Sequence, residues 1–338
     1  MSNDFPTTYW HVLKDGLLQC DLCPNACKLK EGQRGICFLH QRKNNQIVLT
    51  NYGAVSGLAV DPIEKKPLYH FMPDTRALSF GTIGCNLKCK FCQNWNISES
   101  TDDSLLSQTV TPEAMAQLAV QHQCQSIAFT YNEPIITLEY TVNTAKACHE
   151  LGIKTVAVTN GYICHRPRKE FFEHIDATNV DLKSFNEDFY RKLTGSKLQP
   201  ILDTLIYLKQ KTNVWLEITT LIIPGFNDDE KEIDLMTRWI HENLGDDVPL
   251  HFSAFHPCHK MQNVIPTPIE PLMRAREIAF KNGLHYVYIG NILHPESNQT
   301  YCKNCGKIII ERQGFALTGT YIINGACAFC QTMFDGVM

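Results

Sequence analysis

The sequence lacks a long apolar run and an excess of charge of one sign. Nowhere in its 338 residues is there an apolar stretch of the roughly 20 residues that a membrane-spanning helix needs. The N-terminus, MSNDFPTTYW, has no basic segment followed by an apolar one, so we expect no signal peptide. With 31 basic and 35 acidic residues the net charge is −4, which does not indicate nucleic acid as the main partner. We therefore expect a cytoplasmic protein without a membrane partner.

Cysteine, by contrast, is abundant. The chain has 15 cysteines, and in a reducing compartment such residues are more often metal ligands than disulfide partners. Most of them gather in three groups: Cys20, Cys23, Cys27 and Cys37; Cys85, Cys89 and Cys92; and Cys302, Cys305, Cys327 and Cys330. The others, Cys124, Cys148, Cys164 and Cys258, are scattered, and we expect them to be small core or half-buried residues.

Strand-like and helix-like segments alternate between the second and third cysteine groups. We expect strands at 78–84, 126–131, 154–160, 177–183, 214–222, 249–255 and 285–291. We expect helices at 111–123, 136–152, 169–174, 198–211, 228–243 and 267–282, the last beginning with a capping box of Thr267 and Glu270. This alternation predicts an α/β fold with a parallel sheet, in the form of a partial or full (β/α) TIM-like barrel.

Polar side chains follow four of the predicted strands where each strand ends. They are Asn132 and Glu133, Thr159 and Asn160, Asp181 and Lys183, and His256. Because the carboxyl ends of the strands in such a barrel lie at one face, we expect these side chains to meet at one site.

The segment GCNLKCKFCQNW, residues 84–95, places three cysteines in a C-x3-C-x2-C spacing directly after the first predicted strand. A structural zinc site and a 4Fe–4S cluster can each take four thiolates. Three clustered thiolates leave one metal position open to another ligand. The alternative is a zinc site whose fourth ligand lies far away in the sequence.

This cysteine spacing resembles the radical S-adenosylmethionine (SAM) superfamily. The resemblance implies that Cys85, Cys89 and Cys92 hold three irons of a 4Fe–4S cluster and that SAM binds the fourth. It also implies an external one-electron donor, and reductive cleavage of SAM to methionine and a 5′-deoxyadenosyl radical that takes hydrogen from a substrate. Phe91, beside Cys92, would help to keep water away from the radical.

Later segments resemble the activating enzymes of glycyl radical enzymes. These segments are FTYNEP (129–134), VTNG (158–161), VDLKSFNEDFYRKLTG (180–195), WLEITTLIIPGFNDDE (215–230) and SAFHP (253–257). The resemblance implies SAM contacts from Asn132, Glu133, Lys183 and His256, with Thr159, Asn160 and Asp181 around them. Val158 stands where those enzymes carry an acidic residue of a cation site, so the resemblance does not extend to a bound monovalent cation.

Over its whole length the chain resembles the radical SAM proteins of the AmmeMemoRadiSam system. The segments that carry this resemblance are CDLCPNACKLKEGQRGICFLH (20–40), DPIEKKPLYHFMP (61–73), residues 84–98 and YCKNCGKIIIERQGF (301–315). The resemblance does not supply the substrate, which could be a small molecule or a protein. Within 61–73, the side chains of Lys65, Lys66, Tyr69 and His70 could face the substrate or belong to a polar linker.

The two cysteine-rich ends predict metal sites. The C-x2-C-x21-C-x2-C pattern of Cys302, Cys305, Cys327 and Cys330 is typical of a zinc ribbon, with an auxiliary iron–sulfur cluster as the alternative. The N-terminal group could form one closed site, for zinc or an auxiliary cluster, or share a site with the C-terminal cysteines. We expect a cysteine-rich N-terminal region at 1–75, a barrel at 76–295 and a zinc-ribbon-like module at 296–338.

The sequence therefore predicts a radical SAM enzyme with a 4Fe–4S cluster, SAM and zinc, acting on an unidentified substrate. One alternative is an activase that installs a glycyl radical on a partner enzyme. Another is a non-catalytic iron–sulfur or zinc scaffold, which the polar strand ends argue against because a scaffold has no use for a SAM pocket.

Overall fold

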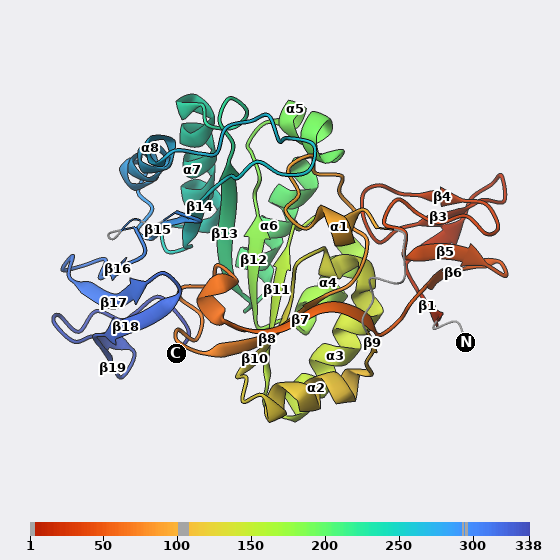
Figure 1. The fold of residues 1–338 in the computed structure, drawn as a ribbon, viewed down its shortest axis with the longest axis horizontal. Helices are drawn as coiled ribbons and strands as arrows, with labels where there is room; N and C mark the ends of the chain where they lie inside the picture. Colours follow the sequence, from red (N-terminus) through yellow and green to blue (C-terminus); the bar gives the residue numbers. More distant parts are fainter. Residues whose placement is uncertain (1–3, 101–107, 293, 295–296) are drawn as a thin grey trace.

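The computed structural model describes residues 4–100, 108–292, 294 and 297–338, and a nine-stranded sheet forms its centre (Figure 1). The expected boundary between barrel and C-terminal module, at 295–296, lies outside the described residues. The parallel strands follow one another across the sheet in chain order: β8 (Arg76–Gly81), β10 (Ser126–Phe129), β11 (Lys154–Thr159), β12 (Ala177–Asp181), β13 (Trp215–Ile222), β14 (Leu250–Ala254) and β15 (Val287–Gly290). The predicted α/β fold with a parallel sheet is confirmed.

The sheet is a partial barrel in the described part of the chain. β7 (Ala54–Pro62) pairs antiparallel with β8, and β9 (Gln108–Thr109) pairs with β7 at the outer edge. Among the described strands, β9 and β15 are the two outer strands and do not pair with each other, so the arc is open.

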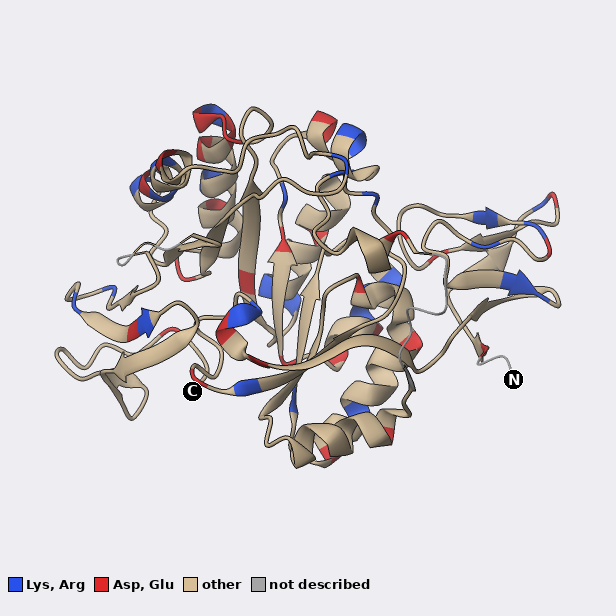
Figure 2. Ribbon diagram, in the orientation of Figure 1, with Lys and Arg blue, Asp and Glu red and all other residues tan. Residues whose placement is uncertain are grey.

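Helices join the parallel strands and bury their apolar faces against the sheet. They are α2 (Pro112–Gln121), α3 (Leu138–Glu150), α4 (His165–Glu173), α6 (Gln199–Lys211), α7 (Glu230–Leu244) and α8 (Ile269–Lys281). Their starts follow from the sequence where a polar cap is present. The Thr111 hydroxyl accepts a hydrogen bond from the Ala114 N–H, 3.2 Å away, and Asp229 caps α7 in the same way. Figure 2 shows that Lys and Arg are interspersed with Asp and Glu along α7 and α8.

The predicted capping box of α8 is wrong. α8 begins after Pro268, and no side chain caps it. The Thr267 hydroxyl instead donates to the Ile222 carbonyl, 2.6 Å away, and accepts the N–H of Phe255 at 2.9 Å. Thr267 is buried between two strand ends, where unpaired peptide groups are costly, so this tertiary role takes precedence over the local cap.

The two cysteine-rich ends flank the barrel. The N-terminal region holds β1 (Phe5–Pro6), β2 (Trp10–Val12), β3 (Leu18–Cys20), β4 (Lys28–Leu29), β5 (His40–Lys43) and β6 (Gln46–Leu49). The C-terminal module holds β16 (Thr300–Tyr301), β17 (Ile308–Gln313), β18 (Ala316–Thr320), β19 (Ile322–Ile323) and β20 (Ala326–Cys327). They lie on opposite sides of the parallel strands (Figure 1), which argues against the alternative of a site shared between the two ends.

The segment after β7 ties the C-terminal module to the barrel. The side chain of Arg312 in β17 is fully buried, and its Nη2 donates to the Tyr69 carbonyl at 2.7 Å. Its guanidinium also lies 4.3 Å from the centre of the Tyr69 ring. From the barrel side, the Glu217 carboxylate of β13 accepts the N–H groups of Tyr69 and His70 at 3.0 and 2.8 Å. Tyr69 and His70 are therefore internal connectors and do not face a substrate.

We predict that Arg312→Met lowers the free energy of unfolding by about 3 kcal/mol, because it leaves a buried carbonyl and the buried Glu64 carboxylate without their cation. Chemical denaturation would measure it. Arg191→Met is the control, since that arginine is exposed and pairs with Asp188 at the surface. Equal stability of the two variants would contradict this role for Arg312.

Candidate active site

The segment 84–95, here called the cysteine loop, has no regular structure before α1 (Trp95–Ser98). Its start is held by Asn132, at the end of β10. The Asn132 side-chain oxygen accepts the Thr82 N–H at 2.9 Å, and its amide nitrogen donates to the Gly84 carbonyl at 2.8 Å. Asn132 thereby joins the ends of β8 and β10 and sets where the loop leaves the sheet.

A short π-turn holds the middle of the cysteine loop. It is η4 (Tyr190–Thr194), which follows α5 (Glu187–Phe189). Its last carbonyls have no partner within the turn, and those of Leu193 and Thr194 accept the N–H groups of Lys90 and Lys88, both at 2.8 Å. Single π-turns often occur at functional sites, and this one fixes two peptide groups between the cysteines.

The thiols of Cys85, Cys89 and Cys92 line one cavity of about 540 Å³, a size typical of small-molecule sites. Burial raises the pKa of Cys89 to about 12 and that of Cys85 well above its ordinary value. A buried thiolate is stable here only beside a cation, and soft thiolates suit iron–sulfur clusters. The structure brings these three predicted ligands together at one cavity.

Glu133 is a deeply buried charged group of this cavity. Its carboxylate accepts the Thr159 hydroxyl at 2.6 Å and the N–H groups of Asn160 and Ile135 at 2.8 and 3.1 Å. Despite these donors, burial raises the pKa of Glu133 to about 7. Glu133 therefore fixes the end of β11 beside β10 and gives the cavity a carboxylate that ionises near neutral pH.

Lys183 and Asp181 form an ion pair at the end of β12, with Nζ and Oδ2 2.9 Å apart. Burial disfavours the charge of Lys183, but the Asp181 carboxylate outweighs it and holds the pKa of Lys183 above its ordinary value. The Lys183 ammonium also lies 5.9 Å from the ring centre of the buried Phe91. The cavity thus has a fixed cation beside the cysteine loop.

The remaining predicted residues have different positions. Asn160 lines the cavity, and its amide donates to the side-chain oxygen of Asn86 in the cysteine loop at 2.8 Å. Thr159 is buried behind Glu133 and does not line the cavity. His256 is exposed, with its Nε2 3.3 Å from the carbonyl of Asn291 at the cavity wall.

Sequence reasoning missed several residues of the cavity. Thr219 and Leu221 of β13 and Ser253 of β14 line it, and the two-residue alternation of strands was the available signal. Phe315, between β17 and β18, reaches it from the C-terminal module, and no local pattern indicates this.

Another part of the cavity wall carries two lysines from the segment after β7, at the short helix η1 (Ile63–Lys65). The ammonium groups of Lys65 and Lys66 contact the two oxygens of Asp61 at 2.8 and 2.7 Å. The Tyr131 hydroxyl donates to the same carboxylate at 3.0 Å. One carboxylate thus balances two cations, which leaves a net positive charge on this wall.

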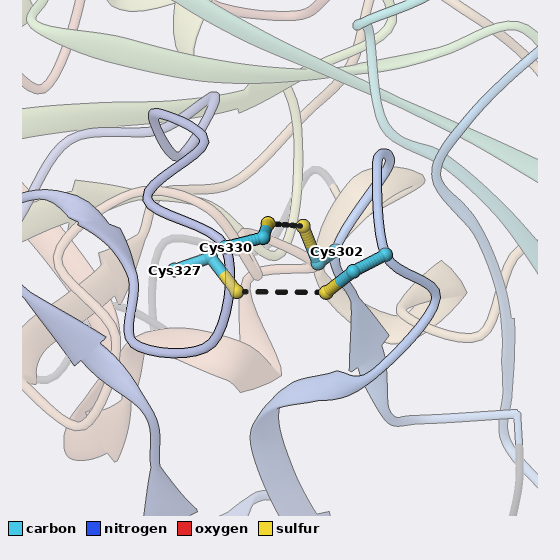
Figure 3. A group of neighbouring side chains, drawn as sticks. Cys302, Cys327 and Cys330 are labelled. Atoms are coloured by element: carbon cyan, nitrogen blue, oxygen red, sulfur yellow. Dashed lines mark hydrogen bonds between the residues drawn. The ribbon is translucent and has the colours of Figure 1, made fainter.

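The C-terminal thiols form a closed group. Figure 3 shows their sulfur atoms facing one another in two pairs, and the Sγ–Sγ distances are 3.5 Å for Cys302 and Cys330 and 3.8 Å for Cys305 and Cys327. All four atoms lie within 4.8 Å of one another. Zn–S bonds of about 2.3 Å in a tetrahedron require sulfur atoms about as far apart as those within these two pairs. These residues can therefore hold one metal ion.

Cys20, Cys23, Cys27 and Cys37 lie together in the N-terminal region, next to the cysteine loop. All 15 cysteines of the sequence fall in the described part of the chain and are free thiols. Cys124 and Cys148 are buried and Cys164 and Cys258 are partly buried, as expected of core or half-buried residues. No helix in the described ranges is long and apolar enough to cross a bilayer.

Comparisons with known proteins extend this description. The Radical SAM superfamily model matches residues 80–236. The chain is 40% identical over 332 residues to the uncharacterized protein MJ0808 of Methanocaldococcus jannaschii, a match that covers 98% of each chain. It is 27% identical over 230 residues to the pyruvate formate-lyase 1-activating enzyme of Escherichia coli K12, covering 62% of this chain and 91% of that one.

A solved structure shares the fold. A radical SAM methyltransferase from Sphaerobacter thermophilus superposes with a TM-score of 0.52 at 14% identity, over 90% of this chain and 81% of that one. The family model spans the cysteine loop and β10 to β13, whose ends line most of the cavity. The chain therefore belongs to the radical SAM superfamily of S-adenosylmethionine-dependent enzymes.

Proposed function

We propose that this protein binds a 4Fe–4S cluster and SAM in the cavity of the cysteine loop and acts on a substrate by hydrogen abstraction. The cluster would supply the electron that cleaves SAM to methionine and a 5′-deoxyadenosyl radical. The observation that carries the proposal is the meeting of three thiols with Glu133 and Lys183 in one cavity. Three thiolates leave a metal position for SAM, which a scaffold would not need.

The charges of the cavity match those of SAM. The Glu133 carboxylate suits the ammonium and sulfonium groups, and the Lys183 ammonium suits the carboxylate. Asp181 and Asn160 surround these groups, while Asn132 and Thr159 act as positioning residues through their hydrogen bonds. His256 would have to turn inward from the rim to contact SAM. Phe91 shields the metal side from water.

The wall with Lys65 and Lys66 is the proposed place of the substrate. Its net positive charge favours a substrate with an anionic group. Phe315 adds an apolar surface from the C-terminal module. The similarity to pyruvate formate-lyase 1-activating enzyme supports a second candidate substrate, which is a glycyl residue of a partner protein. Deuterium transfer from labelled candidates into 5′-deoxyadenosine would tell these two substrate classes apart.

We also propose that the C-terminal thiols hold zinc and that the regions 1–75, 76–295 and 296–338 act as metal-binding extension, catalytic barrel and zinc module. The free thiols fit a reducing compartment, so we place the protein in the cytoplasm.

We predict that Cys85→Ala, Cys89→Ala and Cys92→Ala each abolish formation of 5′-deoxyadenosine, because each removes a ligand of the open-position cluster. Chromatography of anaerobic reactions with dithionite and SAM would measure the product. Cys124→Ala, in the core near α2, is the matched control and should retain activity. Product formed at the parent rate by any of the three variants would refute the assignment, and none from the parent would favour a scaffold.

We predict that SAM affinity rises roughly tenfold between pH 6 and pH 8 through ionisation of Glu133. Burial holds the pKa of Glu133 at about 7, so the neutral acid dominates at pH 6 and the carboxylate that attracts the SAM ammonium dominates at pH 8. Calorimetric titration at both pH values would measure this rise, and Glu133→Gln should remove it.

Glu139→Gln provides the control for this pH dependence. Burial also raises the pKa of Glu139 to about 7, but Glu139 does not line the cavity. This variant should keep the parent pH dependence. If Glu133→Gln kept it as well, the titrating group would lie elsewhere.

We predict one zinc ion per chain at the C-terminal thiols, because two facing CxxC pairs close a tetrahedron. Metal analysis of anaerobically purified protein should find zinc in the parent and none in a Cys305→Ser, Cys330→Ser double variant, with iron unchanged. Loss of iron in place of zinc would mean that this module holds a redox cluster.

A further inference from the structure

The N-terminal thiols are arranged as metal ligands. Cys20, Cys23 and Cys37 are only 7, 8 and 7% exposed. Peptide N–H groups nevertheless donate to each of the four sulfurs: Leu22 to Cys20, Asn25 to Cys23, Ile36 to Cys27, and Leu39 and His40 to Cys37. In the cysteine loop, the Leu87 N–H donates to the Cys85 sulfur in the same way, at 3.4 Å.

These donors distinguish the N-terminal thiols from core cysteines. Cys148 is a fully buried core cysteine, and no N–H group donates to its sulfur. N–H groups directed at a sulfur favour its thiolate form. Buried sulfurs that are prepared for negative charge need a cation among them. The surroundings of the N-terminal thiols therefore suit a metal site.

The spacing of the sulfurs indicates which kind of metal. Within the described residues, only the C-terminal group brings three or more ligand atoms within 4.8 Å of one another. Neither the N-terminal group nor the cysteine loop does so. Four thiolates on one zinc must lie this close, whereas thiolates on separate irons of a cluster stand farther apart. In this respect the N-terminal group is like the cysteine loop and unlike the C-terminal group.

The N-terminal ligand segment touches the cysteine loop directly. The Cys37 carbonyl lies where a side chain at Gly84 would begin, 2.1 Å from an added Cβ, so only glycine fits there. The amide of Asn25 donates to the Asn86 carbonyl at 2.7 Å, and Lys88 lies 4.5 Å from the Phe38 ring centre. Figure 1 shows β3 to β6 beside α1, which ends the cysteine loop.

We propose that Cys20, Cys23, Cys27 and Cys37 hold a second 4Fe–4S cluster, which passes electrons to the cluster of the cysteine loop. The electron transfer to the cluster of the cysteine loop rests on the proposed function. One electron moves from a low-potential donor protein of the flavodoxin or ferredoxin class to the N-terminal cluster, from the 2+ to the 1+ state. It then moves to the cluster of the cysteine loop and is consumed in breaking one S–C bond of SAM.

Iron analysis of the reconstituted full-length protein tests the second cluster. We expect about eight irons and one zinc in the parent, and about four irons and one zinc after Cys20→Ala with Cys37→Ala. Cys27→Ser, at the partly exposed ligand, is a milder second variant and should also lose the N-terminal cluster signal by EPR. Cys148→Ala is the control and should keep eight irons. An unchanged iron content in both variants, or loss of zinc in place of iron, would overturn the site.

The relay is tested by comparing two reductants in single-turnover reactions. With reduced flavodoxin, the variants should form 5′-deoxyadenosine at least tenfold more slowly than the parent. With dithionite, which can reduce the cluster of the cysteine loop directly, the rates should agree within about twofold. Equal rates with flavodoxin would overturn the relay. A parent protein with eight irons but no 5′-deoxyadenosine with either reductant would refute the proposed function and leave the second cluster standing.

Discussion

The active site depends on hydrogen bonds that hold the irregular cysteine loop against the ends of the strands. A loop without helix or strand must find partners for its peptide groups elsewhere. Asn132 forms hydrogen bonds with the peptide groups at the start of the loop, and carbonyls of the π-turn accept the N–H groups of Lys88 and Lys90. The three thiols therefore face one cavity, because these hydrogen bonds fix the backbone that carries them. Most of these partners lie far from the loop in sequence.

A second requirement is a cavity wall that the strands do not supply alone. The segment with Lys65 and Lys66 and the C-terminal residue Phe315 line the cavity together with the strand ends. Both elements are held by the buried contacts of Tyr69 with Arg312 and Glu217. The C-terminal module therefore shapes the cavity even though its four thiols lie outside it.

The regular part of the fold could be predicted because helices and strands repeat every 3.6 and 2 residues. Errors arose where a side chain had a stronger partner at long range. Thr267 matches a capping box in sequence, but two strand ends bind its hydroxyl. The π-turn at 190–194 had no local signal, because its carbonyls are satisfied by the cysteine loop.

By itself, the sequence determined the residue types and spacings from which the metal sites were predicted, because cysteines on one short turn are close in any fold that contains it. It also indicated that Glu133, Asp181 and Lys183 lie near strand ends, because the residue pattern of each strand shows roughly where the strand stops. Only the tertiary structure decided that Thr159 donates a hydrogen bond to Glu133 without lining the cavity, and that Phe315 reaches the cavity. The physical reason is that a local pattern places a residue on its own element, whereas its partners are set by packing between elements distant in sequence.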